Sequence, residues 1–173
     1  MNPVKINKIY IDEQVKDHPF TKNIVKNLPA IPAEITKMPP TASISQGKQI
    51  IYITNYKGNF CKPCPGTSEE YLCCNYQIIN ETTGCPLDCA YCILQGYMNS
   101  SVLTVYANYE KIFSEFDRFY KNYPRRIIRI GTGELADSLA LENFTNISSL
   151  LIPYFKRRKG ILFRIYFFLQ GIV

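Results

Sequence analysis

The chain has 173 residues, of which 46% are apolar, and this is enough for one packed domain. The charged fraction of 20% excludes a disordered or coiled-coil composition. The formal net charge of +6 is compatible with a nucleic-acid partner but does not require one. No run of eighteen uncharged apolar residues occurs, and the N-terminus lacks an apolar signal segment, so we expect a cytoplasmic protein without a membrane span.

Residues 1–60 are predicted to form a small N-terminal α+β segment with a proline-rich linker. Strands are expected at 8–11 and 48–56, from alternation and from β-branched and aromatic content. Between them, 12–26 has a helical pattern that Pro19 should interrupt. The four prolines within 28–43 predict an extended connection.

A first group of cysteines has the spacing C-x2-C-x8-C-C and consists of Cys61, Cys64, Cys73 and Cys74. Such a group is compatible with a second metal site, holding zinc or iron and sulfur. Adjacent cysteines in an extended chain point in opposite directions, which argues against four ligands on one metal. The alternative is a set of small buried thiols beside the main site.

Residues 61–173 are predicted to form a second unit in which strands and helices alternate. Strands are expected at 76–80, 126–130 and 161–169, and helices at about 109–120 and 139–159, with Pro153 straining the second helix. This alternation is typical of βαβ units, so the sequence predicts a parallel sheet. Right-handed crossovers should place consecutive strands side by side, with their carboxyl ends at one edge.

The most informative motif is C-x3-C-x2-C, formed by Cys85, Cys89 and Cys92 within the stretch 84–95. Three thiolates can hold three irons of a four-iron cluster, and the fourth iron then stays open to another ligand. A structural zinc site would normally need four ligands. On spacing alone a cluster is favoured, and zinc or unliganded thiols remain as alternatives. In a reducing compartment cysteines are more often ligands or catalysts than disulfide partners.

A second motif, Gly131-Thr132-Gly133-Glu134, follows the next predicted strand. Because sites in such sheets form beyond the carboxyl ends of the strands, both motifs should lie at the same edge. The glycines allow the backbone to approach a ligand closely, and Glu134 offers a carboxylate to a cation such as an amino group. The alternative for this motif by itself is a plain turn from strand to helix.

Together these stretches resemble the spore photoproduct lyase family of radical S-adenosylmethionine enzymes. The resemblance covers about 61–159 and rests on 76–80, on Cys85 with 89–95, and on 131–141. It implies a partial (β/α) barrel, with a [4Fe-4S] cluster held by the three cysteines of the C-x3-C-x2-C motif. It also implies that Gly131, Thr132, Gly133 and Glu134 line the S-adenosyl-L-methionine site, and that Tyr91 packs against the cluster and the cofactor.

The activity implied by the resemblance is reductive cleavage of S-adenosylmethionine to methionine and a 5′-deoxyadenosyl radical. In the lyases this radical abstracts hydrogen from a crosslinked thymine dimer, and a cysteine returns a hydrogen to the product. The implied partners are a DNA substrate and a reductant such as a flavodoxin or a ferredoxin.

Three features depart from the family pattern. No cysteine follows Cys92, so the hydrogen donor stays unassigned, and Ile93 stands where the lyases have a tyrosine. Only about three barrel strands can be counted from 76 to 173, the last of them the apolar stretch 161–169, so we expect a C-terminally truncated form. The competing hypotheses are a zinc-containing basic nucleic-acid-binding protein and an inactive remnant.

Overall fold

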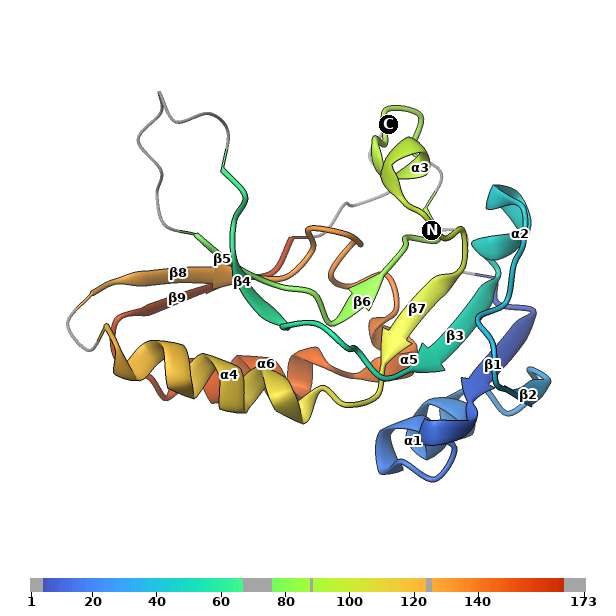
Figure 1. The fold of residues 1–173 in the computed structure, drawn as a ribbon, viewed down its shortest axis with the longest axis horizontal. Coiled ribbons are helices and arrows are strands. Elements are labelled where there is room, and N and C mark those ends of the chain that lie inside the picture. Colours follow the sequence, from blue (N-terminus) through green and yellow to red (C-terminus); the bar gives the residue numbers. More distant parts are fainter. Residues whose placement is uncertain (1–4, 67–75, 88, 124–125, 167–173) are drawn as a thin grey trace.

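The structure is a computed structural model that describes residues 5–66, 76–87, 89–123 and 126–166. Two sheets lie next to each other in the molecule (Figure 1). The first has the strand order β2-β1-β3-β7-β6, and the second has the order β4-β5-β8-β9. The N-terminal elements are β1 (Lys8–Asp12), a 3-10 turn (Glu13–Val15), α1 (Pro19–Asn27), β2 (Ala33–Thr36), α2 (Ile44–Gly47) and β3 (Ile50–Thr54).

The five-stranded sheet is parallel from β2 to β7 (Leu103–Tyr106), and only β6 (Thr82–Thr83) runs antiparallel. The predicted strands at 8–11 and 48–56 correspond to β1 and β3. The predicted extended connection across 28–43 contains β2, which pairs with β1 along four residues. The short strands β2 and β7 were not predicted, since each has only four residues.

Pro19 begins α1, so the prediction that it interrupts a longer helix is wrong. Proline suits the first helical position, where its missing N–H would have had no partner in any case. His18 caps this helix, with Nδ1 accepting a hydrogen bond from the backbone N–H of Phe20 at 3.2 Å. The preceding residues form the separate 3-10 turn instead of continuing the helix.

In the four-stranded sheet, β5 (Gln77–Ile79), β8 (Ile128–Gly131) and β9 (Ile161–Arg164) are parallel, as predicted. β4 (Cys61–Pro63) joins β5 in antiparallel pairing. The connection from β5 to β8 contains α3 (Leu94–Tyr97) and α4 (Glu110–Lys121), and that from β8 to β9 contains α5 (Glu142–Thr145) and α6 (Ser148–Lys156). The predicted helix at 139–159 is therefore two helices.

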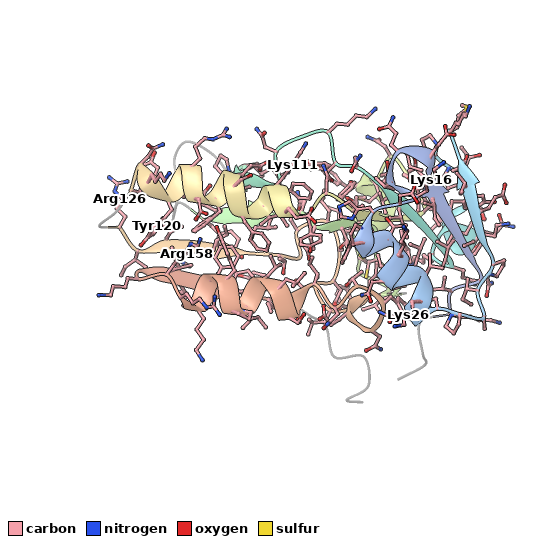
Figure 2. The ribbon with its side chains drawn as sticks, turned by 90° about the horizontal axis from the view of Figure 1, so that it is seen from below. Lys16, Lys26, Lys111, Tyr120, Arg126 and Arg158 are labelled. Carbon is pink, nitrogen blue, oxygen red and sulfur yellow. The ribbon has the colours of Figure 1, made fainter. Side chains whose placement is uncertain are left out.

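The break between α5 and α6 lies at Asn146, whose φ of 50° is left-handed, and not at Pro153. Asparagine tolerates this conformation better than most residues do, so it ends α5. Pro153 is accommodated inside α6. Helices α4 and α6 run side by side below the sheet (Figures 1 and 2).

A polar contact joins α4 to α6 at the position of Arg158 (Figure 2). The Arg158 guanidinium donates to Asp117 at 2.6 Å and lies 3.5 Å from the centre of the Tyr154 ring. Beneath it, Phe116 and Phe155 pack edge to face with ring centres 4.9 Å apart. These contacts fix the helix layer that covers one face of the second sheet.

Alternation along the strands separates a core face from a second face. On the core face, Ile79, Ile130 and Phe163 pack with the buried side chains of the helix layer. The neighbouring positions on these strands form a second row across the sheet, in which Ile78 and Arg164 lie on either side of Gly131. Because successive side chains point to opposite faces, this row belongs to the face away from the helices.

One hydrophobic core runs through both sheets and includes Ile9 and Ile53 of the first and Ile130 of the second. β6 and β7 follow residue 61 in sequence but pair within the N-terminal sheet. The division at residue 60 stays a prediction. No helix in the described ranges is long and apolar enough to cross a membrane.

Candidate functional site

The cysteine loop, 84–95, leaves the short strand β6 and leads into α3. Gly84 has a φ of 88°, a left-handed conformation that glycine adopts without strain, and it turns the chain into the loop. Farther along, the N–H of Cys92 donates to the carbonyl of Cys89 at 3.0 Å. This turn brings the backbone of the third cysteine of the motif close to that of the second.

Cys85 has the surroundings of a sulfur ligand. Burial raises the pKa of its thiol, and backbone hydrogen bonds at Leu87 and Asp137 oppose that increase. Such bonds stabilise a thiolate and are a common feature around metal-bound sulfur. A cavity of about 100 Å³ lies beside the loop and is lined by both Cys85 and Cys92. These observations fit sulfur ligands for an iron–sulfur cluster.

Within the described ranges, no three Cys, His, Asp or Glu side chains converge closely enough to hold a single metal ion. Two thiolates bound to one zinc at about 2.3 Å can be at most about 4.6 Å apart, whereas a cluster places each thiolate on a different iron. The described residues therefore contain no preformed site for a single metal ion.

The glycine loop, 131–138, leaves the carboxyl end of β8. A Cβ on Gly131 would clash with the hydroxyl of Tyr76 and the carbonyl of Arg164, so only glycine fits here. Gly133 has a φ of 89°, which also favours glycine. At both glycines the backbone of this loop therefore comes close to other segments of the same polypeptide.

A buried hydroxyl network ties the glycine loop to the end of β9. Thr132 Oγ1 donates to Ser138 Oγ at 2.7 Å, and the N–H of Tyr166 donates to the same oxygen at 3.1 Å. The N–H of Ser138 in turn donates to the carbonyl of Tyr166 at 2.9 Å. Ser138 was not predicted as part of the site, because its role depends on contact with a strand far along the chain.

The cysteine loop and the glycine loop meet at one edge of the sheet. The N–H of Gly84 donates to the carbonyl of Leu135 at 2.9 Å, and Asn80 Nδ2 donates to Glu134 Oε2 at 3.0 Å. The predicted juxtaposition of the two motifs is therefore present in the structure. It follows from the parallel pairing of β5 with β8, which places the ends of both strands next to each other.

A pocket of about 360 Å³ opens in front of the glycine loop. All four residues of the Gly131-Thr132-Gly133-Glu134 motif line it, together with Cys64, Pro65, Tyr76, Ile78 and Tyr166. Burial raises the pKa of the Tyr76 phenol, and the neighbouring Tyr166 adds to this. The Tyr76 hydroxyl is buried without a hydrogen-bond partner of normal geometry among the described residues.

Lys62 reaches the same site from β4, with Nζ 3.0 Å from Glu134 Oε2. Lys62 pairs with Ile78, and Cys61 pairs with Ile79, so alternation along β4 places Lys62 on the pocket face. Cys64 lies two residues after Lys62 and so points to the same face, where it lines the pocket.

Cys61 faces the opposite way. Its thiol lies 3.7 Å from the carbonyl of Ile112 on α4, and burial, with a smaller contribution from Glu115, raises its pKa to about 12. A thiol in this environment stays protonated and is a poor metal ligand. The predicted second metal site therefore gains no support from Cys61 and Cys64, while Cys73 and Cys74 lie outside the described residues.

Tyr91 and Ile93 project from the cysteine loop, with 77% and 79% of their surfaces exposed. The packing of Tyr91 against a cluster and cofactor stays a prediction, because those groups are not part of this structure. The basic residues Arg126, Lys156, Arg157 and Lys159 lie before β8 and β9, at the amino ends of these strands, and Arg158 is engaged with Asp117. These residues therefore lie at the edge of the sheet opposite the carboxyl end of β8, where the glycine loop begins.

Neither a protein-family model nor a curated protein matches the sequence. The fold does match solved structures. A structure of a spore photoproduct lyase variant superposes with a TM-score of 0.78 at 17% identity, over 94% of this chain and 50% of the other. The chain has the fold of spore photoproduct lyase.

Two further matches are spore photoproduct lyase complexes. One contains dinucleoside spore photoproduct and has a TM-score of 0.78 at 16% identity. The other is a variant with bound AdoMet and dinucleoside spore photoproduct, with a TM-score of 0.77 at 17% identity. Both superpose on 94% of this chain, which spans 50% of each of those proteins. The predicted α/β fold of the lyase type is confirmed.

Proposed function

We propose that the protein is a radical S-adenosylmethionine enzyme of the spore photoproduct lyase family. The observation that carries this proposal is the contact between two loops at the ends of neighbouring parallel strands. One loop bears the C-x3-C-x2-C motif and the other bears Gly131-Thr132-Gly133-Glu134, and the hydrogen bond from Gly84 to Leu135 joins them. The lyase fold, found without detectable sequence relatives, supports the same assignment.

In this proposal Cys85, Cys89 and Cys92 hold a [4Fe-4S] cluster with one open iron. When bound, the cluster and S-adenosylmethionine supply the one-electron cleavage that yields a 5′-deoxyadenosyl radical. Gly131 and Gly133 let the loop pack closely against Tyr76 and Tyr166 in the pocket wall, and Glu134 binds the amino group of the cofactor. The apolar and aromatic lining of the pocket keeps water away from the reaction.

Among the described cysteines, Cys64 is our candidate for the hydrogen donor, the role that no cysteine after Cys92 can fill. It lines the pocket with Tyr76 and Glu134, and its N–H donates to the Tyr76 carbonyl at 2.8 Å. Its S–H bond would break as a C–H bond forms on the product radical, which leaves a thiyl radical on Cys64. One electron from the reductant and one proton from solvent then restore the thiol.

The proposed substrate is a lesion in DNA, and the proposed electron source is a flavodoxin or a ferredoxin. The neighbours with bound dinucleoside spore photoproduct support a nucleic-acid substrate. The basic cluster at 156–159 is poorly placed to bind the lesion, because it lies at the edge away from the pocket. Lys62 and Arg164, on the pocket face, are better placed to meet a phosphate.

The deciding experiment is electron paramagnetic resonance of the anaerobically reconstituted and reduced protein, with and without S-adenosylmethionine. We expect the signal of a reduced cluster, and we expect its shape to change when S-adenosylmethionine is added. A soluble protein that loads zinc and gives no cluster signal would overturn the proposal in favour of a zinc-containing nucleic-acid-binding protein. A cluster signal without formation of 5′-deoxyadenosine would favour the inactive remnant.

A further inference from the structure

Glu134 is held by two partners on one of its two carboxylate oxygens. Lys62 Nζ and Asn80 Nδ2 each lie 3.0 Å from Oε2. Asn80 is 98% buried, since 2% of its surface is exposed, and its Oδ1 has no hydrogen-bond partner within the described ranges. The carboxylate is therefore held through Oε2, and Glu134 lines the pocket.

The orientation of the Asn80 amide follows from this arrangement. Nδ2 must face the carboxylate, because the reverse orientation would place two acceptor oxygens against each other. Asn80 therefore acts on the pocket only through Glu134, which lines it, whereas Asn80 itself lies buried behind the carboxylate.

Lys62 is the mobile member of the three. Its side chain is 39% exposed, whereas that of Glu134 is 24% exposed. A lysine on an edge strand can move its ammonium into water while its stem stays on the protein surface. The strength of such a partly exposed ion pair is modest, about 0.2–1 kcal/mol, so an incoming cation can replace it.

We propose that Lys62 is a built-in counterion that occupies the ammonium site at Glu134 until a ligand ammonium displaces it, and that Asn80 positions the carboxylate for this exchange. The inference rests on the proposed function, in which that ligand is the amino group of S-adenosylmethionine. Lys62 is thus a positioning residue that limits affinity for the cofactor and prevents an unpaired carboxylate in its absence.

The test compares equilibrium binding of two probes, S-adenosylmethionine and 5′-methylthioadenosine, which lacks the amino-acid part and so has no ammonium. Lys62→Met should bind S-adenosylmethionine about two- to five-fold more tightly than the wild type, as expected from the loss of a weak competing pair. Binding of 5′-methylthioadenosine should not change. Lys62→Arg keeps the counterion and should resemble the wild type.

A matched control is Lys8→Met, which removes an ion pair of similar length, 2.8 Å to Glu34, on the other sheet. It should leave the affinities of both probes unchanged. Equal or weaker binding of S-adenosylmethionine by Lys62→Met would overturn the inference and leave the proposed function intact. A wild-type protein that binds neither probe would overturn both.

Asn80→Leu gives a second, independent reading, because it removes the amide at similar volume. S-adenosylmethionine should bind about ten-fold or more weakly, the effect of losing a hydrogen bond that involves a charged group. Binding of 5′-methylthioadenosine reports whether the pocket is still folded. An equal loss of affinity for both probes would contradict a specific role for Asn80 at the ammonium.

Discussion

The cysteine loop and the glycine loop lie side by side but are stabilised differently. In the glycine loop, Thr132, Ser138 and the backbone of Tyr166 form a closed set of hydrogen bonds, and Gly131 has no space for a side chain. In the cysteine loop, Tyr91 and Ile93 are more than three-quarters exposed. Contacts within the protein chain itself specify the first loop, whereas in the proposed function the second loop supplies ligands to a cluster.

The difference has a physical consequence for the proposed cofactors. A loop that is rigid before binding contributes geometry without an ordering cost, and this suits recognition of a small molecule. A loop with few internal contacts gains its order from the metal, because the free energy of ligation is also free energy of folding. The comparison therefore predicts that substitutions in the two loops affect different measurable properties.

The largest effect is expected at the cysteines. Replacement of Cys85, Cys89 or Cys92 by alanine should reduce iron and sulfide after anaerobic reconstitution to less than about a tenth of the wild-type content, since each thiolate holds its own iron. The melting temperature of the metal-free protein should hardly change. Cys61→Ala is the control and should keep full iron content. Retention of iron by the Cys85 variant would show that this residue is not a ligand.

In the glycine loop the expected effect is on stability. Gly131→Ala forces a methyl group against Tyr76 and Arg164, and such overpacking costs about 1–3 kcal/mol. The melting temperature should fall by about 3–10 °C. Gly96→Ala, in α3 directly after the cysteine loop, is the matched control, because nothing lies within 4 Å of the added carbon. Equal melting temperatures for the two variants would contradict the contrast between the loops.

Glu81, which lies just before β6 and the cysteine loop, should make the free energy of unfolding depend on pH. Burial, with added repulsion from Glu142, raises the pKa of Glu81 to about 8 from its ordinary value of 4.5. The folded protein keeps the proton up to about pH 8, whereas the unfolded chain releases it near pH 4.5. The contribution of Glu81 to stability is thus complete below pH 4.5 and is lost as the pH rises to 8.

Glu81→Gln should remove this dependence, since glutamine stays neutral. The variant should melt about 5 °C or more above the wild type at pH 8, and the two should converge near pH 4.5. Thermal unfolding followed by circular dichroism across this range measures the effect. A constant difference between the two proteins at every pH would mean that Glu81 does not titrate in this range.

The smallest effect is expected from the first cysteine group. A Cys61→Ser, Cys64→Ser double variant should contain the same iron and zinc per chain as the wild type, because Cys61 faces the helix layer and Cys64 faces the pocket. Elemental analysis of both proteins, reconstituted in parallel, checks this. A loss of one metal ion per chain would restore the second metal site.

Much of the arrangement could be read from local patterns. Period-two alternation and β-branched runs located β1, β3, β5, β8 and β9, and the order of strands and helices predicted the parallel pairing of β5, β8 and β9. The adjacency of the two motifs followed from that pairing alone. Residues whose part in the site depends on side-chain contacts between distant segments were missed, among them Ser138 and Asn80.

The sequence by itself determined the parallel order β5-β8-β9 and the position of both loops at one edge, because strand periodicity and the handedness of βαβ crossovers are local constraints. Only the tertiary structure decided that Lys62 meets Glu134, that Cys64 enters the pocket, and that Cys61 turns into the core. These contacts depend on how β4 pairs with β5, which closes a loop whose partners no local pattern specifies.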